Sequence, residues 1–189
     1  MNGSDVLQAG SECGTALAAQ IPRDWSITAP QMDISVSEVV AHAATGPLWY
    51  ALDLWSGPHD DAAFDVRVRA DSTNSALVRS LVNSSQVCAA SIDSAPPGTR
   101  GFHPSGSPDR SGFAALACDE MLVHTWDALD GLGLDFRPDV ALAAKVIKRL
   151  FPEVELGNDP WLSLLWANGR IELGRAGLRT EWSWHPAPF

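Results

Sequence analysis

Residues 113–130 read FAALACDEMLVHTWDALD, and this stretch decides the fold. On a helical wheel its side chains are apolar almost all round, and Gly131 follows where such a helix would end. A helix that is apolar on every side is covered on every side, so we predict that it is a central element of a helical bundle. Its few ionisable side chains are therefore informative.

Five further helices are predicted, over residues 4–20, 36–55, 73–90, 139–151 and 160–168. The second of them follows Ser35-Val36-Ser37-Glu38, which has the capping-box spacing. Residues 95–109, APPGTRGFHPSGSPD, hold too many Pro and Gly to continue a helix and are long enough for a functional loop. The tail, residues 170–173 and 178–184, alternates like a β-hairpin around an Arg-Ala-Gly turn. The fold class that we expect is all-α.

Length and composition indicate a single domain. The 189 residues have 46% hydrophobic content, which is enough to bury a full core. We expect residues 1–158 to form the helical bundle and residues 159–189 to form a C-terminal helix and tail that pack on it. The three cysteines have no CxxC spacing, so we predict that they are small buried hydrophobes; they are Cys13, Cys88 and Cys118.

The charge balance argues against several classes of partner. Twenty-three acidic against thirteen basic residues give a net charge of -10, so the chain has no electrostatic reason to approach nucleic acid or an anionic membrane. No apolar run approaches the roughly 18 to 20 residues of a membrane span, and the start lacks the order of a signal peptide. We therefore expect a soluble cytoplasmic protein that acts on a small molecule.

Glu120, His124 and Asp127 share one face of the apolar helix. Burying an unpaired carboxylate costs several kcal/mol, so the group needs a partner cation, mutual hydrogen bonds or a metal. The i, i+4 spacing lets Glu120 and His124 reach one divalent ion. That spacing is weak by itself, because Glu and His four residues apart also occur by chance as a simple pair.

A third ligand must come from another helix, and His42 is the best placed of the remaining histidines. Periodicity alone also fits a half-exposed polar face, because Glu38, Trp49 and Asp53 share its sector. His103 lies in the long loop, where it could reach over a pocket or have only a structural role. The other two histidines, His59 and His185, lie in loops or the tail.

The order of these motifs resembles the DinB-like family, and more closely the N-terminal domain group of mycothiol-dependent maleylpyruvate isomerase. The likeness is carried by residues 33–42, DISVSEVVAH, and residues 117–127, ACDEMLVHTWD. It extends to residues 97–104, 150–152, 165–170 and 182–188, which is most of the chain. In that group, one helix supplies a His and a second helix supplies a Glu and another His to the same metal. His42, Glu120 and His124 stand at those three places.

The resemblance implies a four-helix bundle with a divalent metal at one end of its core, zinc first, with nickel and iron also suited. It further implies an enzyme that uses mycothiol or another low-molecular-weight thiol, as an isomerase or an S-transferase, because a metal lowers the pKa of a thiol. Asp127 and His103 are then candidates for a catalytic role, Asp127 by orienting His124 or a water.

The chain departs from the isomerase in one respect, because it is too short for the full C-terminal domain whose arginine helps to hold cofactor or substrate. Arg100 and Arg170 are candidates to replace that arginine, and Arg175 and Arg179 are further ones. A non-catalytic metal or small-molecule binding bundle is the alternative function. A third reading has no metal, with Glu120 and His124 paired beside an apolar pocket. The apolar surface and the tryptophans also allow a homodimer.

Overall fold

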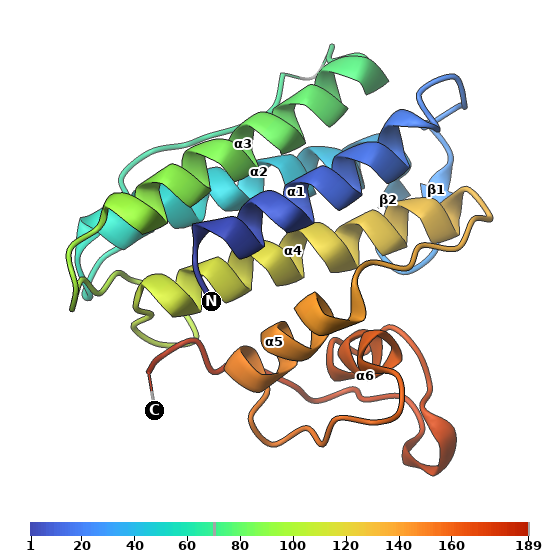
Figure 1. Ribbon diagram of the computed structural model, residues 1–189. Helices are drawn as coiled ribbons and strands as arrows, with labels where there is room; N and C mark the ends of the chain where they lie inside the picture. Colours follow the sequence, from blue (N-terminus) through green and yellow to red (C-terminus); the bar gives the residue numbers. More distant parts are fainter. Residues whose placement is uncertain (70, 189) are drawn as a thin grey trace.

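A computed structural model describes residues 1–69 and 71–188 of the chain. Over these residues the chain is mostly helical, as predicted, and Figure 1 shows the arrangement. The helices are α1 (Gly3–Ala18), α2 (Val36–Ser56), α3 (Asn74–Ser94), α4 (Arg110–Gly131), α5 (Val140–Leu150) and α6 (Pro160–Ala167). A single 3-10 turn, η1 (Gly174–Ala176), lies in the tail.

Helix α4 is the central helix that its composition predicts. Every residue from Gly112 to Thr125 is buried, because α4 contacts α1, α2 and α3 on one side and α5 on the other. The four long helices lie side by side, with α1 and α2 each packed against α3 (Figure 1). Burial of this many apolar side chains is the main favourable term in the stability of the fold.

Local signals in the sequence fix where the long helices begin. Ser35 and Glu38 form the predicted capping box, in which each side chain accepts a hydrogen bond from the other residue's backbone N–H group. Asp109 caps α4 by accepting a hydrogen bond from the N–H of Gly112. These caps determine the start of the two helices that carry the candidate site.

A two-stranded antiparallel sheet precedes α2 and was not predicted. Strands β1 (Thr28–Ala29) and β2 (Ile34–Ser35) pair Thr28 with Ser35 and Ala29 with Ile34. Strands of two residues are too short to show an alternating pattern, so the sequence carried no signal for them. The paired strands lead the chain directly into the capping box of α2.

The predicted β-hairpin of the tail is reduced to one isolated bridge, between Glu172 and Leu178, with η1 between them. The tail is instead held by Arg149 of α5, which donates hydrogen bonds to the backbone carbonyls of residues 185–187 and to Asp109. These contacts fix the chain just beyond the predicted hairpin, because one guanidinium can donate several hydrogen bonds.

Two further predictions can be compared with the structure. All three cysteines are buried and unpaired, and burial raises the pKa of Cys13 and of Cys88 to about 12. Among the described residues, no helix is both long enough and apolar enough to span a bilayer. The predicted division at residue 158 stays a prediction. Helix α5, before this point, contacts both α4 and α6, and α6 lies after it.

Candidate metal centre

Two helices bring the three predicted ligands together. His42 comes from α2, and Glu120 and His124 come from successive turns of α4. Glu120 Oε1 lies 2.7 Å from His42 Nε2 and 3.3 Å from His124 Nε2. One ligand atom of each residue lies within 4.8 Å of the other two. The site therefore has two imidazole nitrogens and one carboxylate oxygen converging on a single point.

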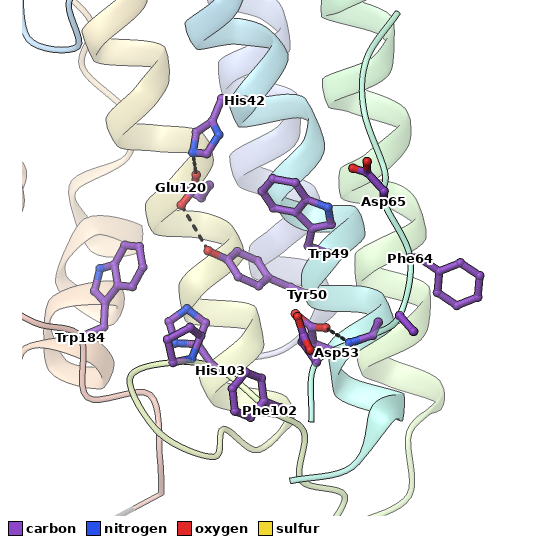
Figure 2. A pocket seen from close by; sticks show the side chains of 14 residues that line it. His42, Trp49, Tyr50, Asp53, Phe64, Asp65, Phe102, His103, Glu120 and Trp184 are labelled. Carbon is purple, nitrogen blue, oxygen red and sulfur yellow. Dashed lines mark hydrogen bonds and ion pairs between the residues drawn. The ribbon is translucent and has the colours of Figure 1, made fainter. Parts of the chain in front are cut away.

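Glu120 is the most enclosed of the three, with only 5% of its side chain exposed. Burial alone raises the pKa of this carboxyl group, but hydrogen bonds with His124 and His42 outweigh it and hold the pKa well below its usual range. The hydroxyl of Tyr50 donates a hydrogen bond of 3.2 Å to Oε2 (Figure 2). Both carboxylate oxygens of Glu120 thus have a fixed direction.

Asp127 orients the ring of His124. Its Oδ2 lies 2.9 Å from His124 Nδ1, and its carboxylate also accepts hydrogen bonds from the guanidinium of Arg170, with Nε at 2.9 Å. A carboxylate paired with arginine only accepts hydrogen bonds, so Nδ1 of His124 carries the proton and Nε2 points toward Glu120. Burial opposes a charge on His124, but Asp127 and Glu120 raise its pKa to about 9.

A glycine on α2 leaves room for the carboxylate. Gly46 lies one turn after His42, and a Cβ atom built there would lie 2.7 Å from Glu120 Cγ. Real carbon atoms not bonded to each other approach to about 3.5–4.0 Å. Only a residue without a side chain lets α2 pass this close to Glu120.

The donor set fits a divalent metal. Two imidazoles and one carboxylate leave at least one position open in a tetrahedral site, as in catalytic zinc sites. The hydrogen bond from His124 Nδ1 to a carboxylate is the usual support of a metal-ligating histidine. This His42–Glu120–His124 group could therefore hold a metal ion.

A cavity of about 750 Å³ opens beside these ligands, and His42 and Glu120 form part of its wall. Aromatic side chains from four segments line it, and Figure 2 shows Trp49 and Tyr50 of α2 facing Trp184 of the tail. His103, of the long loop, stands between Tyr50 and Trp184, with ring centroids 6.0 and 5.6 Å away. The predicted functional loop thus contributes to the wall of the cavity.

Three of the four arginines that the resemblance suggested have partners inside the protein. Arg170 binds Asp127, Arg100 donates hydrogen bonds to the carbonyl of Ser107, and Arg179 pairs with Glu153. None of these arginines lines the cavity beside the metal ligands. Their role in binding an anionic ligand stays a prediction.

Sequence reasoning missed several residues of the site. The space at Gly46 and the hydroxyl of Tyr50 were not predicted, although these residues follow His42 on α2 at helical spacing, four and eight residues later. That spacing was the available signal. The position of Trp184 in the cavity wall had no comparable signal, because the indole is held there by a hydrogen bond of 2.9 Å from Nε1 to Asp119.

Compared with protein-family models, curated proteins and solved structures, the chain matches none.

Proposed function

We propose that this protein is a metal-dependent, thiol-using enzyme of the isomerase or S-transferase type, built on a DinB-like four-helix bundle formed by α1 to α4. One observation carries the proposal: His42 and Glu120 of the His42–Glu120–His124 group line a cavity large enough for a small molecule. A purely structural metal site would be closed on all sides, whereas this one borders open space.

The proposed metal is zinc, with nickel and iron as other suited ions, and the proposed co-substrate is mycothiol or another low-molecular-weight thiol. A divalent metal lowers the pKa of a thiol and so supplies a nucleophile at neutral pH. The sulfur then forms a bond to an electrophilic carbon, either at a double bond or with loss of a leaving group. The buried cysteines of the chain do not compete for this role, since none lines the cavity.

The chain's own residues have distinct parts in this proposal. Asp127 holds His124 with Nε2 facing Glu120, and Tyr50 holds Glu120. His103 accepts a hydrogen bond from the N–H of Ser105 at Nδ1, so its neutral ring carries the proton at Nε2. Burial lowers the pKa of His103, which favours that neutral form. Nε2 is then a hydrogen-bond donor for an oxygen of the substrate.

Metal content tests the first half of the proposal. Elemental mass spectrometry on untagged protein should find about one equivalent of a divalent metal. Glu120→Ala and His124→Ala, purified in the same way, should lose it. His59→Ala is the matched control, because this exposed histidine should leave the metal content unchanged. Wild-type protein that stays free of metal after reconstitution would refute the site.

Turnover tests the second half. The metal-loaded protein is incubated with mycothiol, and separately with simpler thiols, against a panel of activated double bonds and alkyl electrophiles. Adduct or isomer formation that disappears in Glu120→Ala supports the enzyme. Metal binding without turnover of any pair would instead support the non-catalytic binding bundle.

A further inference from the structure

We propose that the cavity beside the metal centre selects an amine-bearing organic molecule and rejects carboxylic acids. This inference rests on the proposed function, because it names the class of ligand that the same cavity takes. Three features of the wall carry it: its charge, its aromatic rings and a hydrogen-bond donor of His103 that is open to the cavity.

The charge of the wall is negative. Three aspartates line the cavity in addition to Glu120, namely Asp53 of α2 and Asp61 and Asp65 of the segment that follows it. Among residues 1–69 and 71–188, no lysine or arginine lines this cavity. Arg67 pairs with Asp65 at 2.7 Å, but both side chains are exposed and such a pair is strongly screened by water. A ligand carboxylate would therefore meet like charges, and only the proposed metal ion would offset them.

Asp53 is the innermost of these aspartates. It is half-buried on α2, one turn after Trp49 and Tyr50, and accepts a hydrogen bond of 2.8 Å from the N–H of Ala62 (Figure 2). Burial raises the pKa of Asp53, with the hydrogen bond opposing it. A cation nearby stabilises the ionised carboxylate of such a group, so an ammonium is the complementary ligand charge.

The aromatic rings suit the same ligand. Trp49, Tyr50 and Trp184 offer π surfaces to the cavity, and Trp184 is held in place by its hydrogen bond to the buried Asp119. Organic cations bind to the faces of aromatic rings through the ring quadrupole, with tryptophan the strongest. The aromatic rings and the acidic groups at the edge of this wall would each attract an ammonium group.

His103 offers the ligand a hydrogen-bond donor. The residue is only 9% exposed, and its Nδ1 is occupied by the N–H of Ser105. Its Nε2 has no hydrogen-bond partner within residues 1–69 and 71–188, although the ring lines the cavity. This N–H group opens onto the cavity, so an acceptor atom of the proposed ligand, such as a hydroxyl or carbonyl oxygen, would bind to it.

Three thiols of nearly equal size test the charge preference: cysteamine, 2-mercaptoethanol and 3-mercaptopropionate. Each is titrated into the zinc-loaded protein by isothermal titration calorimetry at low ionic strength. We expect cysteamine to bind at least about tenfold more tightly than 3-mercaptopropionate, with 2-mercaptoethanol between them. The ratio should shrink at 0.5 M salt, where charges in contact with solvent are screened.

Variants separate the wall charge from direct chelation of the metal. Asp53→Asn and Asp61→Asn should each reduce the ratio of the two affinities about two- to fivefold. Asp60→Asn is the matched control, because it removes the same charge from the neighbouring position outside the cavity wall. If direct chelation of the metal alone produced the difference in affinity, the ratio would be the same in all three variants as in the wild type. That result would overturn the inference.

The remaining outcomes distinguish this inference from the proposed function. Equal affinity for all three thiols, or tighter binding of 3-mercaptopropionate, overturns the charge preference and leaves the thiol-using enzyme standing. If no thiol binds, the proposed function fails, and benzylamine against benzoate then decides the ligand class. Tighter binding of benzylamine supports the inference, whereas equal binding, weaker binding or no binding of either overturns it.

Discussion

Gly46→Ala is the most informative single substitution, because it adds one methyl group beside Glu120 and replaces none of the three candidate ligands. The added Cβ would lie 2.7 Å from Glu120 Cγ, 3.4 Å from Cδ and 3.6 Å from Oε1. An ordinary carbon contact is about 3.5–4.0 Å, so the Glu120 side chain or the two helices must move apart by about 0.8 Å or more. Metal sites tolerate displacements of only about 0.5 Å.

The free energy of folding should change little. Alanine is the better helix former by about 1 kcal/mol, while overpacking costs about 1–3 kcal/mol. We therefore expect a folded protein whose unfolding free energy is lower by up to about 2 kcal/mol. The zinc affinity should fall about ten- to a hundredfold, as it does when the support of a ligand is disturbed.

The assay is competition for zinc with a chromophoric chelator, alongside urea unfolding of the metal-free protein. Gly14→Ala is the matched control. Its Cβ would lie 2.5 Å from Val82 Cγ2, in the contact between α1 and α3, so it overpacks the core without contacting a ligand. A folded Gly46→Ala protein with unchanged zinc affinity would refute the role assigned to this close approach.

Three further substitutions or modifications have defined outcomes. Asp127→Asn should lower the zinc affinity about ten- to a hundredfold in a competition titration, because Asp127 orients His124. Asp130→Asn, three residues later on α4, is the control and should leave the affinity unchanged; equal effects would contradict the orienting role of Asp127. Native protein at pH 8 should resist a thiol reagent such as Ellman's reagent and react only on unfolding, because burial keeps the cysteines protonated; rapid labelling would be the contrary result. Arg149→Lys should lower the unfolding free energy measured in urea by about 2–3 kcal/mol, because a lysine cannot replace the hydrogen bonds that the guanidinium donates to residues 185–187 and to Asp109. Lys148→Met, on the exposed side of α5, is the control and should leave the unfolding free energy almost unchanged.

The sequence predicts the helices well because their signals are local. The run of apolar side chains in α4 and the Ser35–Glu38 capping box each lie within a few turns of chain, and both are confirmed. The association of His42 with Glu120 is different, because 78 residues separate them and only the packing of α2 on α4 brings them together. The resemblance of the motifs predicted this association, whereas periodicity alone left it open.

The partners of the buried charges could not be predicted in the same way. Arg170 was a candidate for binding an anionic ligand, but its guanidinium pairs with Asp127 from a distant part of the chain. The donor on His103 depends on a two-residue turn that places the N–H of Ser105 against Nδ1. Such contacts depend on loop conformation, and loop conformation leaves little periodic trace in a sequence.

The C-terminal segment belongs to the candidate site as much as α2 and α4 do. Asp119 and Asp127 are fully enclosed carboxylates of α4, on either side of the ligands Glu120 and His124 in the sequence. Besides His124, which bonds Asp127 within α4, their partners come from residues 159–189: Asn168 and Trp184 donate to Asp119, and Arg170 donates to Asp127. A buried carboxylate deprived of its partners costs several kcal/mol, so the helices that hold the ligands depend on this segment. The segment therefore forms part of the cavity wall and supports the candidate metal centre. An isolated bundle of residues 1–158 would lack Trp184 in the wall and the partners of Asp119 and Asp127 that this segment supplies.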